Sequence, residues 1–152
     1  MTDDHLRTGE QLALVLTDYG MPRMNARLIA ALLVTDRDTV TQGELSEDLG
    51  AAAGSVSAAI NVALRVGLAE RVPMPGSRRE HYRLRDDAWA RLFTEQNQAT
   101  SDMLAAARAT RDAVDADSPA HRRLSDMCDF YEYLLAELPA ILDRWQASRR
   151  RS

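Results

Sequence analysis

The hydrophobic pattern of this chain changes period at Gly67, and this change limits the fold more than any other feature. Apolar residues in 56–64 recur at helical spacing. Beyond Gly67, apolar and polar side chains alternate on both sides of a turn signal at residues 75–77, Pro-Gly-Ser. The pattern therefore predicts a helix that leads directly into a hairpin of two strands.

Alternation divides the return strand of this hairpin into two faces. Tyr82 and Leu84 fall on one face, where we expect them to reach the core. Arg79, His81 and Arg83 fall on the other. The return strand therefore presents positive charge away from the core.

Three helices are predicted before this unit. The first ends at Gly20, and the second begins at Pro22 and ends near residue 36. A short third helix through residue 49 follows from Thr41 and Glu44, which have the spacing of a capping box. The outward positions of the fourth helix, residues 56–64 and their neighbours, are small and polar.

Two long helices are predicted after the hairpin, one from residues 86–87 toward residue 114 and one from Pro119. A seven-residue repeat in the last helix forms an apolar seam: Leu124, Cys128, Tyr131, Leu135, Leu138, Leu142 and Trp145. A helix over residues 119–149 would be about 46 Å long, whereas a compact domain of this size is about 38 Å across. The seam is therefore expected to pack against a second copy of the chain. Pro139 predicts a kink or break within this helix.

Charge is distributed unevenly along the 152 residues. The chain has a net charge of −4, yet residues 51–85 hold six arginines and two glutamates, for a local charge of +4. Localised positive charge favours a defined anionic partner. The sequence has no apolar stretch long enough to span a bilayer and no signal peptide at its N-terminus, so we expect a cytoplasmic protein with no membrane partner.

The order of these elements describes a mainly α protein with a small two-stranded β-wing. It is a winged helix-turn-helix domain flanked by N- and C-terminal dimerisation helices. Four stretches resemble the MarR family of bacterial transcription regulators, and specifically its GbsR-like branch: GMPRMNARLIAALLV, TVTQGELSEDLG, GSVSAAINVALRVGLAERV and PGSRREHYRL. The resemblance is close over residues 20–85. It assigns residues 1–19 and 86–152 to dimerisation, with room for an effector pocket in the latter.

The resemblance implies a homodimer that binds a pseudo-palindromic site on double-stranded DNA and acts as a ligand-responsive repressor at the nucleoid. One recognition helix per copy would enter the major groove. The expected contacts of this helix are Ser55, Ser57, Ala58, Asn61 and Arg65. The expected contacts of the wing are Ser77, Arg78, Arg79, His81 and Arg83.

Some residues favour other interpretations. Ala52 and Ala53 stand where relatives often have a serine and a basic residue, so a winged-helix module that binds protein without reading an operator remains the alternative. Cys128 lies on the seam and is expected to be buried and inert, although oxidation sensing stays open. The histidines lack ligand spacing, so we expect no metal and no cofactor. Catalytic motifs are absent from the sequence, which argues against an enzyme. The identity of any small-molecule effector is left open.

Overall fold

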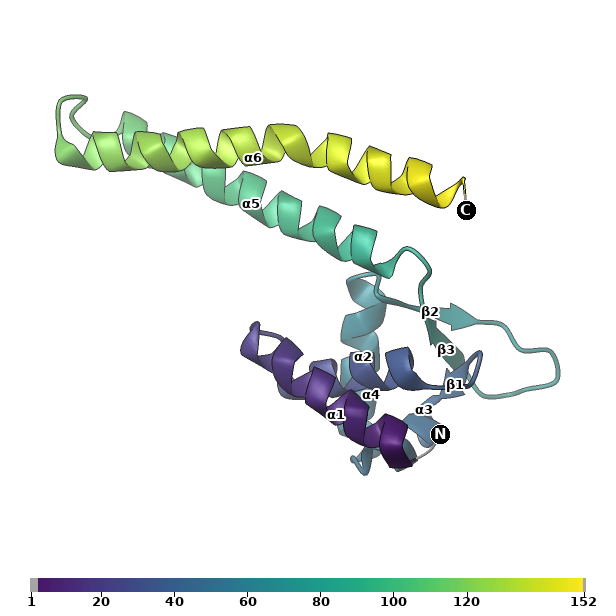
Figure 1. The fold of residues 1–152 in the computed structure, drawn as a ribbon. Helices are drawn as coiled ribbons and strands as arrows, with labels where there is room; N and C mark the ends of the chain where they lie inside the picture. The colour runs from purple at the N-terminus through teal and green to yellow at the C-terminus, as the bar shows by residue number, and fades with distance from the viewer. Residues whose placement is uncertain (1–2, 152) are drawn as a thin grey trace. The chain divides into compact units, whose positions relative to one another are not determined.

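The computed structural model describes residues 3–151 and is mainly helical, as predicted. Figure 1 shows the elements, which are α1 (Asp3–Asp18), α2 (Arg23–Val34), β1 (Val40–Thr41), α3 (Gln42–Leu49), α4 (Ala53–Arg65), β2 (Ala69–Val72), β3 (His81–Leu84), α5 (Ala88–Asp112) and α6 (Pro119–Arg149). The chain divides into two compact units, one ending at Leu92 and the other beginning at Phe93. None of the helices in the described range is long and apolar enough to cross a membrane.

The sheet of the first unit has three antiparallel strands in the order β1-β3-β2: the predicted two-stranded wing is present as β2 and β3, and β1 is an additional strand. The added strand, β1, pairs Val40 with Tyr82 and Thr41 with His81. A strand of two residues is too short to show alternation, which is why no sequence pattern reveals it. Its effect is to tie the base of the wing to the start of α3.

A single core joins α2, α3 and α4 to the sheet. Of the inward residues predicted for the recognition helix, Val56, Ile60 and Ala63 are buried, and Leu64 is half-buried against the same core. Tyr82 on β3 is 5% exposed, and Leu84 packs against the same core, as their shared face predicts. Because α4 and β3 both pack on this core, the core fixes the orientation of α4 relative to the base of the wing.

The two ends of α3 are defined by local interactions. The Glu44 amide donates to Thr41 Oγ1 (3.3 Å), and the Thr41 amide donates to Glu44 Oε2 (2.8 Å), which completes the predicted capping box. These bonds hold the pKa of Glu44 below its ordinary value, chiefly through the backbone amide of Thr41. Gly50 then ends α3 with a left-handed backbone, φ 55°, that favours glycine.

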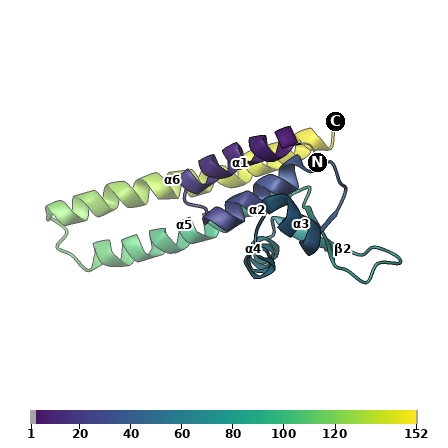
Figure 2. The same ribbon diagram turned by 90° about the horizontal axis from the view of Figure 1, so that it is seen from below.

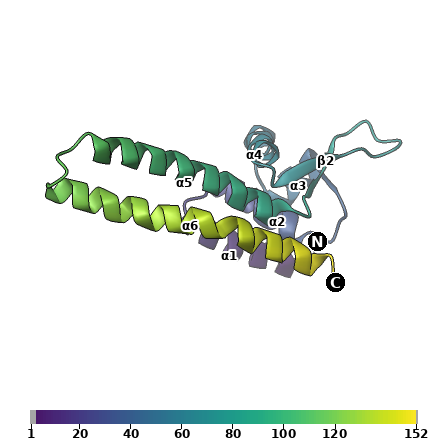
Figure 3. The ribbon, with the colours of Figure 1, turned by 90° about the horizontal axis from the view of Figure 1, so that it is seen from above.

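The second unit contains α5 from Phe93 onward and all of α6, and these two helices run antiparallel (Figures 1 and 3). Cys128 is fully buried against Leu104 and Ala107 of α5, and Tyr131 and Leu135 pack around it. The first half of the predicted seam is thus used within one chain, and the expectation that it meets a second copy needs correction. The link between α5 and α6 is short, so α5 is the apolar surface that lies nearest to the seam of α6.

The remaining seam positions are mixed: Leu138 is buried, Leu124 and Leu142 are half-buried, and Trp145 is 52% exposed. The helix α6 also continues without interruption through Pro139, so the expected break does not occur. Pro139 lies on the exposed side of α6. Water can therefore satisfy the carbonyl that loses its backbone donor there.

Candidate nucleic-acid interface

Helix α4 presents the predicted polar face to solvent. Ser55, Ala58, Asn61 and Arg65 are exposed, and Ser57 is half-buried. The side chains of Asn61 and Arg65 have no partner within residues 3–151, so their hydrogen-bonding groups are available to a ligand. An exposed amide and guanidinium on one helix face suit the edges and phosphates of a major groove.

The first turn of α4 has no side-chain cap. Its N-cap residue is Ala52, with extended backbone angles (φ −63°, ψ 140°) and no side-chain hydrogen bond. The amides of the next residues, Ala53 to Ser55, find no acceptor in the described part of the chain. The alanine at this position, where relatives often have serine, thus leaves these amides for water or an anion.

The tip of the wing is a tight turn. The Ser77 amide donates to the Met74 carbonyl (3.1 Å), and Gly76 has φ 81°, as position three of a type II turn requires after Pro75. The following strand begins at His81, so Arg78 and Arg79 belong to the loop rather than to the return strand. Both arginines are exposed.

Acidic partners neutralise the other arginines of the wing. Arg83 Nε lies 2.7 Å from Glu70 on the neighbouring strand, and this hydrogen bond raises the pKa of Arg83. Arg71 lies 3.2 Å from Glu80, which also accepts a hydrogen bond from the Tyr82 hydroxyl (2.6 Å). Glu70 and Glu80 were missed as part of this region.

The turn alone does not reveal the first of these pairs. A hairpin folded tightly about Pro75-Gly76 would place Glu70 opposite His81, whereas the structure pairs Glu70 with Arg83. Opposite charges on paired strands attract each other. The Arg83 guanidinium, although exposed, is therefore already paired with a carboxylate of the same chain.

The arginines without a partner are confined to one region of the first unit. Among residues 3–92, only Arg65, Arg78 and Arg79 have side chains with no ion pair or hydrogen bond. Figures 2 and 3 show that α4 and the hairpin lie on the side of this unit away from α1. Positive charge that is not internally neutralised thus gathers at α4 and the wing.

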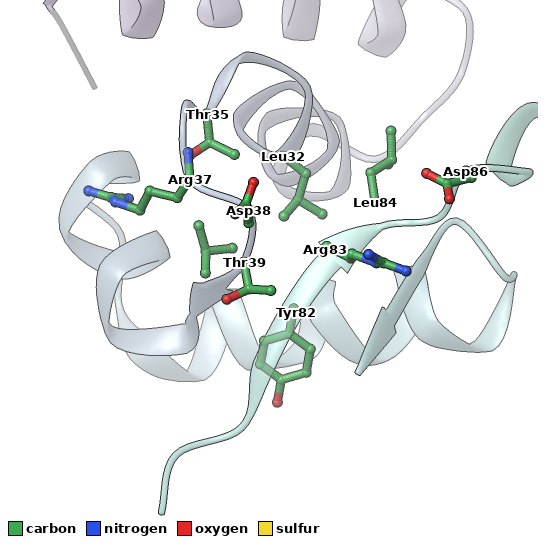
Figure 4. A pocket seen from close by; sticks show the side chains of 10 residues that line it. Leu32, Thr35, Arg37, Asp38, Thr39, Tyr82, Arg83, Leu84 and Asp86 are labelled. Atoms are coloured by element: carbon green, nitrogen blue, oxygen red, sulfur yellow. The ribbon is translucent and has the colours of Figure 1, made fainter. Parts of the chain in front are cut away.

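A cavity of about 230 Å³ lies between the loop after α2 and the sheet. Figure 4 shows Arg37 and Arg83 extending away from its middle in opposite directions. Arg37 is held 2.7 Å from Asp48 on α3, and Arg83 is held by Glu70. Its remaining charged groups, Asp38 and Asp86, are acidic. Its cations are therefore occupied, and its volume is below that of typical small-molecule sites.

Comparisons with known proteins agree with this geometry. A MarR family model matches residues 19–80, and a model described as an MmpR5-like MarR family transcriptional regulator matches residues 87–149. The HTH-type transcriptional regulator MmpR5 of Mycobacterium tuberculosis is 30% identical over 126 residues, which cover 82% of this chain and 76% of that protein. The chain belongs to the MarR family.

Solved structures were also compared with this MarR-family chain. A crystal structure described as a transcriptional regulator has a TM-score of 0.80 and 28% identity, covering 95% of this chain and 99% of its own. Wild-type MarR from E. coli in its apo form is a weaker match, with a TM-score of 0.44, 16% identity, and coverage of 87% and 89%. Membership of the MarR family, shown by the similarity to MmpR5, makes the chain a DNA-binding transcriptional regulator and not an enzyme, as predicted. The narrower likeness to the GbsR-like branch stays a prediction.

Proposed function

We propose that this regulator is a homodimer that binds a pseudo-palindromic operator on double-stranded DNA. Each copy places α4 in a major groove and its wing along the adjacent minor groove, with half-sites about one helical turn apart. The observation that carries this proposal is that, among the arginines of residues 3–92, only Arg65 on α4 and Arg78 and Arg79 on the wing lack a side-chain partner. Unpaired guanidinium groups attract phosphate without first breaking an internal ion pair.

The proposed contacts divide into reading and positioning. Asn61 is exposed and unpartnered within the described residues, so it can bond an adenine edge through two hydrogen bonds. Ser57, which is half-buried, reaches bases or phosphates at the side of the groove. Arg78 and Arg79 bind phosphates or enter a narrow minor groove, where the negative potential is strongest. We no longer expect Arg83 to contact DNA, because Glu70 already neutralises it.

The proposed roles of the segments are those expected from the sequence. Residues 20–85 bind DNA, and residues 1–19 together with 86–152 form the dimer. Support comes from exposed apolar side chains in the two outer segments. On α1 and in the turn after it, the exposed large apolar residues are Leu12, Leu14, Val15 and Tyr19, of which Leu12, Val15 and Tyr19 follow one another at steps of three and four.

On α6 the exposed set is Phe130, Tyr133, Ile141 and Trp145, between 45% and 70% exposed. At 100° per residue these four lie within a stripe about 120° wide. The stripe is distinct from the face that buries Cys128 against α5. Exposed aromatic residues on a single face of a helix suit a protein interface.

Repression and response to a small-molecule effector are proposed from family membership, and the effector's chemistry stays open. A regulator that binds the chromosome acts in the bacterial cytoplasm, at the nucleoid. The acidic remainder of the chain supports selective binding, because it repels DNA everywhere except near the unpaired arginines.

The test compares two arginines of the same wing. Arg79→Ala removes an unpaired cation, whereas Arg83→Ala removes one already held by Glu70, and both change the net charge equally. Binding to a duplex of about three helical turns is measured across a salt series. We expect Arg79→Ala to weaken binding and to reduce the slope of log affinity against log salt by about 0.9, and Arg83→Ala to leave the slope unchanged.

Equal behaviour of the two variants would contradict the assignment of the wing. A wild-type protein that shows no binding and no salt dependence would instead favour the alternative, a winged-helix module that binds protein.

A further inference from the structure

His81 is bonded inside the protein through both ring nitrogens. It begins β3 and is half-buried. Its Nδ1 lies 3.1 Å from Thr39 Oγ1, in the loop before β1, and its Nε2 lies 3.1 Å from Ser77 Oγ, in the wing turn. A ring with both nitrogens engaged has no polar atom left for DNA, contrary to the role expected from sequence.

Ser77 is in turn hydrogen-bonded to the backbone of Arg79. Its Oγ accepts a hydrogen bond from the Arg79 amide (3.1 Å) and donates to the Arg79 carbonyl (3.4 Å). The backbone on both sides of the Arg79 Cα is thus bonded to one hydroxyl. A line of bonds runs from Thr39 through His81 and Ser77 to the residue that carries the unpaired guanidinium.

One arrangement of protons satisfies every member of this line. Because the Ser77 hydroxyl donates to Arg79, it accepts from His81 Nε2–H. His81 Nδ1 is then unprotonated and accepts from the Thr39 hydroxyl. The three side chains therefore form a complete set of bonds in the free protein.

We propose that His81 is a positioning residue that holds Arg79 ready for DNA, an inference that rests on the proposed function. All of residues 73–80 are exposed, so the wing loop has little core packing to order it. Ordering such a loop only on binding would reduce affinity, because each immobilised residue loses conformational entropy. The bonds from His81 order the loop in advance, and β1 links the same strand to the start of α3.

The experiment is a double-mutant cycle on the full-length protein. His81→Ala, Ser77→Ala, Arg79→Ala and the doubles with Arg79→Ala are titrated against the same duplex of about three helical turns, across a salt series. We expect His81→Ala and Ser77→Ala each to lower affinity and to remove part of the salt slope, which falls by about 0.9 for one phosphate contact. Neither should have any further effect once Arg79 is alanine.

Two conservative variants distinguish a positioning role of His81 from a general contribution to the stability of the fold. The amide of His81→Gln reaches the Nε2 position and can bond Ser77, so it should restore binding. The amide of His81→Asn reaches only the Nδ1 position, near Thr39, so it should not. Thermal unfolding of each variant shows whether the fold is kept, and Ser77→Ala tests the same line of bonds if His81→Ala does not fold.

Losses that add to that of Arg79→Ala would overturn the inference, because His81 would then contact DNA independently. Wild-type affinity in both His81→Ala and Ser77→Ala would overturn it as well. An Arg79→Ala protein that binds like wild type would overturn the proposed function of the wing, and this inference with it.

Discussion

The uncapped start of α4 allows a stabilising substitution at Ala52. The N-cap residue already has the extended backbone that a capping side chain needs, with φ −63° and ψ 140°. The amides of Gly54 and Ser55, the second and third residues of the helix, are without acceptors in the described range. Ala52→Ser supplies one acceptor for them without moving the chain.

The expected gain follows from the value of an N-cap. Exchange between serine and alanine at this position changes stability by about 0.5–2 kcal/mol. For a chain of about 150 residues, 1 kcal/mol raises the unfolding temperature by roughly 2–4 °C. Ala52→Asp should gain slightly more, because its charge also interacts favourably with the helix dipole, by about 0.3–1 kcal/mol. Ala53→Ser, one residue into the helix, is the matched control and should gain nothing from capping.

The two assays are urea unfolding and titration with duplex DNA. Unfolding is measured at a fixed protein concentration, because dimerisation makes the apparent stability depend on concentration. We expect Ala52→Asp to be more stable than wild type yet to bind DNA more weakly, because its carboxylate would face phosphate. Ala52→Ser should be stabilised without that loss. If Ala52→Ser is no more stable than Ala53→Ser, the reasoning about the free amides is refuted. If Ala52→Asp binds DNA as wild type does, the start of α4 does not approach the backbone of DNA.

Two further predictions concern assembly and acid stability. Light scattering at micromolar concentration should give about twice the 16.9 kDa chain mass, and Tyr133→Glu should shift it toward the monomer; a monomeric wild type would contradict the dimer. Hydrogen bonds from Arg85 and then Arg91 lower the pKa of Asp87 to about 2. Because the pKa is depressed in the folded state, the stabilisation is present above about pH 4 and is lost as pH falls toward about 2. Asp87→Asn should remove this part of the pH dependence in unfolding titrations, whereas Asp86→Asn should keep it.

Much of the fold followed from local signals in the sequence. The capping box of Thr41 and Glu44 located the start of α3, and Pro119 located the start of α6, where the structure adds a cap: the Ser118 hydroxyl accepts from the amide of His121. The buried and exposed faces of α4 followed from helical periodicity. These features depend on residues within a few positions of one another, so the sequence carries them directly.

The candidate interface was predicted only in part. Alternation placed Arg83 on the solvent face, as observed, but it did not show that Glu70 lies beside it. His81 was expected to face DNA, and the structure shows its ring bonded to Thr39 and Ser77. Thr39 is 42 residues away in sequence, and periodicity carries no information about such a contact.

The sequence by itself determined the class of the protein: the order of helices, the turn of the wing and the concentration of arginine in residues 51–85. Only the tertiary structure decided which arginines remain unpaired, because ion pairing depends on distances between side chains from different strands. It likewise decided that Cys128 and its neighbours pack on α5, a choice that the apolar repeat alone could not make. A repeat specifies that a face must be buried, but the partner is the surface that the chain brings nearest to it.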